Sequence, residues 1–174
     1  RLEEVKDTAF VPPKAEQFNS TNLRAGIYYC SWNIISDHWL FGVGVGDDKK
    51  MLTDCYATLP TEAYSLQYYN THNQYVNFWL VTGIGSLLLF LASLFYATYI
   101  AFKNGNYILL YFLIILSCSF LSENILSRQA GAVFYYFFVS LIIYYHRVTT
   151  PSSSSLFFLT KNRIFARVKQ PGKT

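Results

Sequence analysis

The sequence predicts an all-α fold, a fragment of a polytopic helical membrane protein with three transmembrane helices and an extracytoplasmic loop that contains an amphipathic helix. Hydrophobic residues make up 52% of the 174 residues and charged residues only 14%, whereas soluble domains average about 25% charged residues. The charges are also unevenly placed, because between residues 77 and 145 only Lys103, Glu123 and Arg128 are charged. The pattern excludes an ordinary soluble domain.

Residues 1–77 form the predicted extracytoplasmic, periplasmic loop. A helix is expected over residues 21–36, where apolar side chains recur at helical spacing behind a hydroxyl cap. Its broad apolar side predicts packing on the membrane surface or on other spans, and the alternate glycines of residues 42–46 predict turns after it. A loop outside the membrane needs an upstream span, so we expect missing transmembrane helices of the same protein before Arg1.

The predicted membrane domain covers residues 78–145. Residues 78–102 carry no charge and would form a helix of roughly 37 Å, enough to cross a hydrocarbon core of about 30 Å. The apolar residues that follow would be nearly twice as long as the membrane in a single helix. We therefore predict that they fold back as two shorter spans, about 107–121 and 130–145, joined by the polar segment 123–129.

Charge predicts the orientation of these spans. The tail, residues 146–174, holds six Lys or Arg and no acidic residue, whereas residues 1–77 hold six basic and nine acidic residues. The positive-inside rule then places the tail in the cytoplasm and residues 1–77 outside.

The three cysteines have no metal-ligand spacing and no redox spacing. Cys30 and Cys55 can pair in an oxidising compartment, although we favour two free, packed thiols. Cys118 lies in an apolar run, where we expect a small buried hydrophobic residue.

Four residues are candidates for chemistry. His72 precedes the first predicted span at the outer boundary, where a neutral imidazole can accept a proton from a hydroxyl, although a lone histidine there is more often an ordinary interfacial residue. Glu123 and Arg128 lie between two spans, where a charge costs roughly 2.5–3.5 kcal/mol at membrane depth; they either pair to close the hairpin or serve function. Arg24 suits bidentate capture of phosphate, or is simply solvated.

Four motifs occur in order over about residues 20–145. They are Arg24 in NLRAGIYYCSW, HWLFGVG from His38 to Gly44, His72-Asn73 nine residues before Gly83, and ENILSRQAG from Glu123 to Gly131. This chain resembles the C-terminal part of the O-antigen ligase family, which includes related polysaccharide polymerases. Trp39 stands where the family usually has proline, and Ser86 stands where it often has glycine, threonine or tyrosine.

The resemblance implies a metal-independent, inverting glycosyltransferase without a cofactor in the bacterial cytoplasmic (inner) membrane. The donor would be a glycan on undecaprenyl diphosphate, and the acceptor a sugar hydroxyl on lipid A–core or on a growing glycan. His72 would be the catalytic base, in preference to His38, which we expect to order the turn at Gly42. The candidate substrate-binding residues are Arg24, Arg128, Glu123, Asn73 and Tyr75. Membrane lipids are expected partners and nucleic acid is not.

Two alternatives remain beside a ligase. One is a repeat-unit polysaccharide polymerase of the same family. The other is a non-catalytic transporter or flippase subunit, which should carry ionisable or broken-helix sites near the middle of the membrane. The charged residues here lie at the ends of the predicted spans, which favours chemistry at the membrane boundary.

Overall fold

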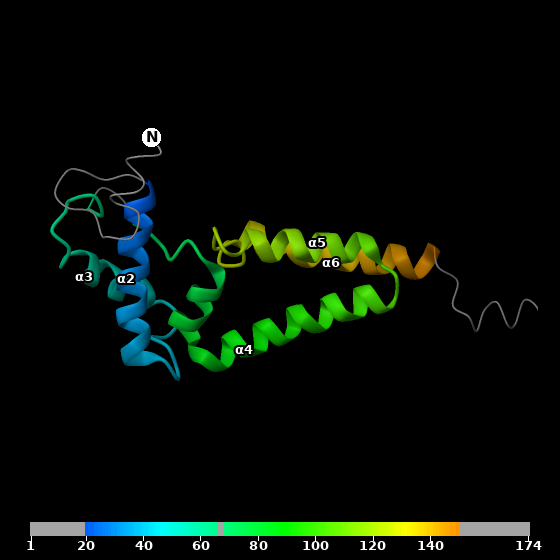
Figure 1. Cartoon of the computed structure of the whole chain (residues 1–174), viewed down its shortest axis with the longest axis horizontal. Coiled ribbons are helices and arrows are strands. Elements are labelled where there is room, and N and C mark those ends of the chain that lie inside the picture. Colours follow the sequence, from blue (N-terminus) through cyan, green and yellow to red (C-terminus); the bar gives the residue numbers. More distant parts are fainter. Residues whose placement is uncertain (1–19, 66–67, 150–174) are drawn as a thin grey trace, which may run out of the picture. The chain divides into compact units, whose positions relative to one another are not determined.

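A computed structural model describes residues 20–65 and 68–149, and within them the chain is all-helical, as predicted (Figure 1). The helices are α2 (Ser20–His38), α3 (Asp48–Tyr56), α4 (Gln74–Lys103), α5 (Tyr107–Ser119) and α6 (Gln129–Thr149). The expectations for residues 1–19 and for the tail beyond residue 149 lie outside the described residues. The chain divides into two compact units, Arg1–Val133 and Phe134–Thr174.

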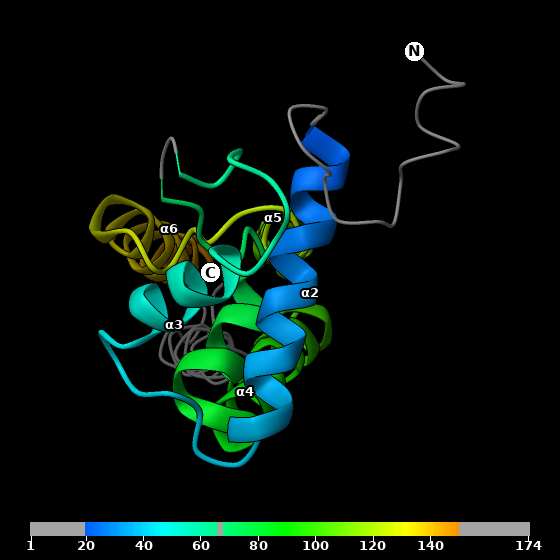
Figure 2. The same ribbon diagram turned by 90° about the vertical axis from the view of Figure 1, so that its left-hand side faces the viewer.

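The core of the first unit lies where α2 packs against both α3 and α4 (Figure 2). Helix α2 is one residue longer at its start and two residues longer at its end than the predicted 21–36. Its buried side includes Ile27, Ile34 and Ile35, which contact Leu52 of α3 and Leu80 of α4 in one hydrophobic cluster. The helical spacing of apolar residues in α2 therefore serves protein packing.

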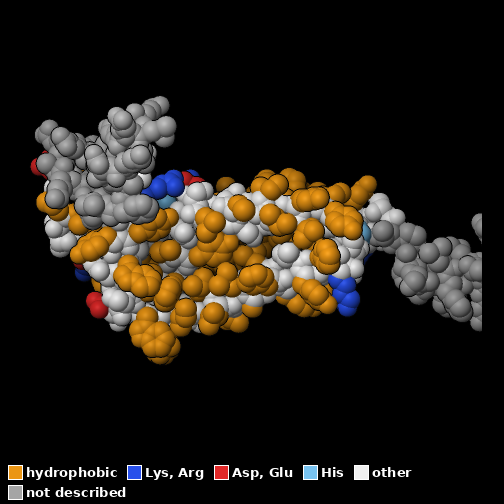
Figure 3. Space-filling view, viewed as in Figure 1, with side chains coloured by type: hydrophobic (Ala, Val, Ile, Leu, Met, Phe, Trp, Pro, Cys, Tyr) orange, Lys and Arg blue, Asp and Glu red, His pale blue; other side chains and the backbone are white. Residues whose placement is uncertain are grey.

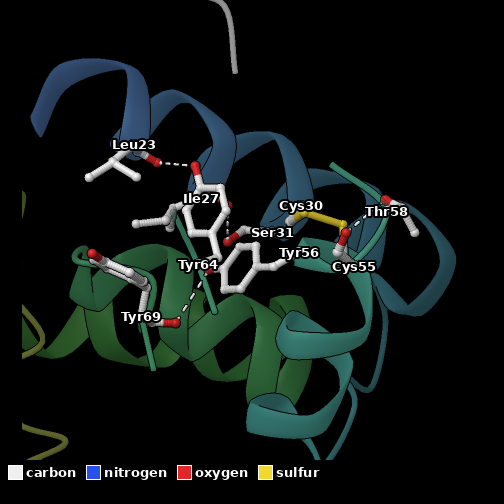
Figure 4. The surroundings of a disulfide bond; sticks show 9 residues. All are labelled: Leu23, Ile27, Cys30, Ser31, Cys55, Tyr56, Thr58, Tyr64 and Tyr69. Carbon is white, nitrogen blue, oxygen red and sulfur yellow. Dashed lines mark hydrogen bonds between the residues drawn. A yellow bond between two sulfur atoms is a disulfide. The ribbon is translucent and has the colours of Figure 1, made fainter. Parts of the chain in front are cut away.

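A disulfide bond joins Cys30 of α2 to Cys55 of α3 (Figure 4), so the preference for two free thiols was wrong. The core brings the two helices face to face and leaves 5.8 Å between the Cα atoms, within the usual range for a disulfide. The sequence alone does not show this approach. Disulfides persist in oxidising compartments such as the periplasm, which agrees with an extracytoplasmic place for this loop.

Tyrosines fill the rest of this core. The rings of Tyr56 and Tyr64 stack at 4.6 Å, and the Tyr64 hydroxyl donates a hydrogen bond to the Leu23 carbonyl at 2.9 Å. Gly26 leaves space for that hydroxyl, because a Cβ atom there would lie 2.1 Å from it. Burial, with a smaller contribution from Tyr69, raises the pKa of Tyr64 to about 12. Tyr64 therefore serves as a neutral donor that ties the loop after α3 to α2.

Helix α4 is broken at Gly83, which has φ 81° and ψ 179°. The rings of Phe78 and Phe90 lie 4.6 Å apart, although twelve residues of straight helix would separate them by roughly 18 Å. The segment before Gly83 is thus folded back on the segment after it, which the prediction of one continuous helix over 78–102 missed. Residues 84–103 alone make roughly 30 Å of helix, the thickness of a hydrocarbon core.

Helix α5 runs back along α4 after a tight turn. The Asn106 side chain accepts a hydrogen bond from the Leu109 amide at 3.1 Å and so caps α5. The helix ends at Ser119, short of the predicted 107–121. Cys118 is exposed, which corrects the expectation of a buried thiol. It lies on a side of α5 that lines a cavity, described below.

Among the described helices, α4 is the one that is long and apolar enough to cross a membrane, and α5 is apolar but shorter. Helix α6 is longer than the predicted span 130–145, and none of its side chains is buried. Its tyrosines at 135, 136, 144 and 145 lower its hydropathy. The second and third spans therefore remain predictions.

Candidate functional site

His72 and Glu123 lie next to each other, with 3.5 Å between Nδ1 of the imidazole and Oε1 of the carboxylate. The Nδ1 atom is buried and has no hydrogen-bond partner among the residues that the structure describes, because this contact is longer than a normal hydrogen bond. The remainder of both side chains is partly open, with 26% of His72 and 46% of Glu123 exposed. His72 and Glu123 thus form an imidazole–carboxylate pair that solvent can reach.

His72 occupies a strained position in the turn before α4. Its φ of 45° is in the left-handed region, which is uncommon for residues other than glycine. Its backbone amide donates to Oδ1 of Asn70 at 3.0 Å and stabilises the turn. Backbone strain of this kind clusters at functional sites, so the conformation supports a role for His72.

A buried polar network holds Glu123 opposite His72. Thr71 and Asn124 exchange two side-chain hydrogen bonds, at 3.1 and 2.9 Å. Oε1 of Gln74 accepts from the Leu126 amide at 2.8 Å. Thr71, Gln74 and Asn124 are each no more than 2% exposed in these positions. Because each of the three contacts the opposite segment, the network fixes the loop after α5 against the start of α4.

Sequence reasoning missed this network. Its one signal was the concentration of Asn, Gln, Ser and Thr in two segments that otherwise adjoin apolar runs. Such side chains are enriched where helices must be joined by hydrogen bonds in an apolar environment.

Asn73 and Tyr75, two of the predicted substrate-binding residues, have structural partners. Oδ1 of Asn73 accepts from the amides of Tyr75 at 3.0 Å and Val76 at 3.1 Å, so Asn73 is the N-cap of α4. The Tyr75 hydroxyl donates to the Ser117 carbonyl of α5 at 3.0 Å. Both residues therefore build the start of α4, and contact with substrate remains a prediction.

A cavity of about 350 Å³ lies between α4 and α5, beside the first turn of α4. Its wall is almost entirely apolar. The lining residues are Tyr75, Leu91, Leu94, Phe95, Thr98, Ile114, Ser117, Cys118 and Leu121.

Two glycines allow the loop after α2 to contact the break in α4 backbone to backbone. A Cβ atom on Gly42 would lie 2.5 Å from the Val81 carbonyl, and one on Gly83 would lie 2.1 Å from the Leu40 carbonyl oxygen. Residues that are far apart in the sequence thus meet where no side chain fits.

The loop also supplies the hydrogen bonds that α4 loses at its break. The Leu80 carbonyl accepts from the Val43 amide, and the Val81 carbonyl accepts from the Gly44 amide, both at 2.9 Å. The Ile84 amide donates to the Trp39 carbonyl at 3.0 Å. Buried backbone groups need such partners, and irregular backbone at membrane depth is tolerated where protein covers it.

Arg24 and Arg128 are both exposed. Within the described residues neither side chain forms an ion pair or a hydrogen bond, with His72 or with any other residue. The alternative of a Glu123–Arg128 pair is not formed, because the carboxylate faces His72 instead. Arg128 contributes to the hairpin through its backbone, where its amide donates to the Ile125 carbonyl at 3.3 Å.

Comparison with known protein families shows which family the chain belongs to. The family model described as O-antigen ligase matches residues 2–91 of the chain. This is more than half of its length, and it includes Arg24, the loop with Gly42, His72 and Gly83. The chain belongs to the O-antigen ligase family. No curated protein and no solved structure matches the chain significantly.

Membership of the O-antigen ligase family gives a coarse function. The family is membrane-associated and groups glycosyltransferases of the ligase or polymerase type, in lipopolysaccharide or polysaccharide biosynthesis. The match ends before Glu123, whereas the resemblance of the motifs extends to about residue 145. Glu123 therefore enters the site through its contact with His72 and not through the family match.

The two departures from the O-antigen ligase pattern lie at the break of α4. Trp39 contributes its carbonyl, which accepts from the Ile84 amide and also from the indole of Trp79 at 3.0 Å. The Ser86 hydroxyl donates to the Gly83 carbonyl at 2.9 Å. Both residues thus support the broken backbone, and neither touches His72.

Proposed function

We propose that this chain carries the catalytic base of a membrane glycosyltransferase. The enzyme would move a glycan from undecaprenyl diphosphate to a sugar hydroxyl outside the cytoplasm. The observation that supports it most directly is the His72–Glu123 contact at the start of α4, within the family-matched His72-Asn73 motif. An imidazole and a carboxylate lie together beside the first turn of an apolar helix, and in the proposal the lipid-linked sugar binds there.

In the proposed mechanism, Nδ1 of His72 carries its proton toward the Glu123 carboxylate, which leaves Nε2 as the base. Nε2 takes the proton of the acceptor hydroxyl as that oxygen attacks the anomeric carbon. The bond from that carbon to the diphosphate oxygen breaks on the opposite face, so the configuration inverts. A carboxylate that orients an imidazole and stabilises its charged form plays the same part in other histidine-base enzymes.

The leaving diphosphate needs compensating positive charge. Arg24 and Arg128 are exposed cations that no acidic residue of the described chain neutralises, so each is free to bind phosphate oxygens. A guanidinium presents a planar fork that binds two oxygens at once. Stabilisation of the negative charge that develops in the transition state is usually a large part of catalysis. The described residues contain no cluster of three His, Cys, Asp or Glu. Metal independence remains part of the proposal.

The acceptor defines the second candidate function. Lipid A–core as acceptor gives a ligase, which the description of the matched family favours, and a growing glycan gives a repeat-unit polymerase. Supplying both acceptors to one preparation with lipid-linked donor distinguishes them by the product. Transport of the donor without formation of a new glycosidic bond would instead identify the non-catalytic alternative.

Substitution of His72 tests the mechanism. General base catalysis is worth about 10²–10⁴-fold, so His72→Ala in the full-length enzyme should lower the rate of glycan transfer by about that factor. Donor binding should change little, because the base acts in the transition state. His72→Asn is the better-matched variant, since asparagine tolerates the left-handed backbone that the turn requires.

His38→Ala is the control for the base. His38 is exposed, and within the described residues it supports its turn only through its backbone carbonyl. It should transfer glycan at the wild-type rate. Wild-type transfer by both His72 variants would remove His72 from the mechanism.

Lysine replacements test the two arginines. Arg24→Lys and Arg128→Lys keep the charge but lose the bidentate fork, so each should weaken binding of the lipid-linked donor. We expect a loss of about tenfold or more per variant, the equivalent of one charge-assisted hydrogen bond. Donor affinity is measured directly, with Lys49→Arg on α3 as the matched control. Unchanged affinity in both Lys variants would make the arginines structural.

A further inference from the structure

The loop after α2 presents a group of exposed apolar side chains, which we call the outer-loop patch: Trp39, Leu40, Phe41 and Val45. Phe41 is 81% exposed and Val45 is 87% exposed. Figure 3 shows that hydrophobic side chains cover much of the face over α4 and continue toward the end of α2. Contiguous exposed apolar surface of this kind marks a site of interaction with a protein or a membrane.

The backbone fixes the place of the patch relative to α4. The loop is hydrogen-bonded to residues 80, 81 and 84, at the break that starts the long apolar segment. That segment, residues 84–103, is roughly 30 Å long, which matches the thickness of the hydrocarbon core. With this segment as a membrane span and Lys103 at one end of it, the patch lies at the other end.

The chemistry of the patch suits this boundary. Trp residues are enriched at the membrane–water interface, where an apolar ring meets polar headgroups. Trp39 and Trp79 are joined by the indole hydrogen bond to the Trp39 carbonyl, and Trp32 of α2 packs edge-on against Trp79 at 5.8 Å. The three tryptophans of the chain are thus linked near the break, Trp32 and Trp79 by their rings and Trp39 through its backbone carbonyl.

Charged residues bracket the patch. Asp37 precedes it and Asp47 follows it, and both are exposed. No charged residue lies between Trp39 and Val45. A carboxylate does not enter hydrocarbon without a large cost, so the two aspartates limit how deep the loop can go. The apolar tip fits a shallow insertion among lipid chains.

We propose that the outer-loop patch inserts into the outer leaflet of the bilayer and anchors the loop and the break of α4 to the lipid surface. The partner is the acyl-chain region just below the headgroups. Insertion of this tip holds the first segment of α4, which begins beside His72, at a fixed depth. The proposal rests on α4 as a membrane span and does not depend on the glycosyl transfer.

Tryptophan fluorescence tests the insertion. The wild-type chain, Phe41→Trp and Lys50→Trp are reconstituted in phosphatidylcholine vesicles. The vesicles contain lipid brominated either near the headgroup or near the end of the acyl chain, and iodide is added outside. Lys50 on α3 is exposed and lies beyond Asp47, so it is the matched control. Intactness of the Cys30–Cys55 bond reports folding of each variant. It is read as labelling of the free Cys118 alone after denaturation under non-reducing conditions.

The emission added by Phe41→Trp should be largely lost with bromines near the headgroup, much less with bromines near the chain end, and little with iodide. The emission added by Lys50→Trp should respond to iodide and not to bromines. Quenching of the Phe41→Trp emission by iodide alone would mean that the patch faces water. Quenching by neither agent would mean that protein covers it. Either result, or quenching of the Lys50→Trp emission by bromines, overturns the proposal.

Discussion

Glu123 is separated from His72 by the whole of α4 and α5, yet their side chains approach within 3.5 Å. The approach depends on Thr71, Gln74 and Asn124, which are buried and hydrogen-bonded across the two segments. A buried polar group without a partner is costly, so the network disfavours other arrangements of the loop. The position of the carboxylate is thus determined by residues that do not themselves titrate.

Glu123→Gln should separate positioning from structure. Glutamine keeps the size of the side chain but cannot stabilise a charged imidazole, so kcat should fall about 10- to 100-fold, less than the loss expected from removing the base. KM should stay unchanged, because the effect belongs to the transition state. Steady-state kinetics of the full-length enzyme measure both values. A raised KM with kcat unchanged would assign Glu123 to ground-state binding of substrate instead.

Ser122→Ala is the control for Glu123. Among the residues that the structure describes, the Ser122 hydroxyl donates only to the nearby Ser119 carbonyl, at 3.1 Å. Its removal should leave both kinetic constants as in the wild type.

At the scale of elements, the break in α4 and the loop after α2 form one unit. The glycines at 42 and 83 permit the contact, and the amides of residues 43 and 44 satisfy the carbonyls that the break exposes. This unit sets the direction of the first segment of α4, which carries the N-cap beside His72. The site and the loop are therefore linked by backbone hydrogen bonds.

Gly83→Ala should disrupt this unit. Its Cβ atom would collide with the Leu40 carbonyl, and its φ of 81° is strained for alanine. We expect the backbone conformation alone to lower the free energy of unfolding by about 1–3 kcal/mol. The loop at residues 39–46 should then be cleaved faster by proteases. Gly85→Ala is the matched control, because no atom lies within 4 Å of its added Cβ. Since alanine stabilises a helix interior by about 0.5–1 kcal/mol over glycine, this control should be neutral or more stable. Equal proteolysis of the two variants would show that the contact is dispensable.

At the scale of the whole molecule, the arrangement across the membrane is the main expectation. Three spans place Lys103 and the tail on the cytoplasmic side and the segment around Glu123 outside. The disulfide between Cys30 and Cys55 agrees with an oxidising surrounding for the loop before α4.

Cysteine labelling tests this topology. Asn104→Cys and Ser122→Cys, each in a Cys118→Ser background, should react with a membrane-impermeant thiol reagent from opposite sides of sealed vesicles. Asn104 lies in the turn after α4 and Ser122 in the turn after α5, and both are exposed. The Cys118→Ser parent without a further cysteine should not be labelled. Labelling of both positions from the same side would contradict the three-span arrangement.

The sequence by itself determined the all-α class, the apolar segment that became α4, and the family. Each depends on local information: composition, the length of an uncharged segment, and the spacing of short motifs along the sequence. It also indicated His72, because it precedes an apolar segment, and Glu123, because it is a rare charged residue between two apolar segments. Nothing in the sequence shows that the two side chains are in contact.

Only the tertiary structure decided which distant residues meet. The Cys30–Cys55 bond, the His72–Glu123 pair and the contact of Gly42 with the broken α4 each join segments that no local pattern connects. Glycine at position 83 is compatible with a straight helix or a broken one. The break is favoured because the loop of residues 39–44 is present to satisfy the backbone groups that it frees, and that depends on the fold as a whole.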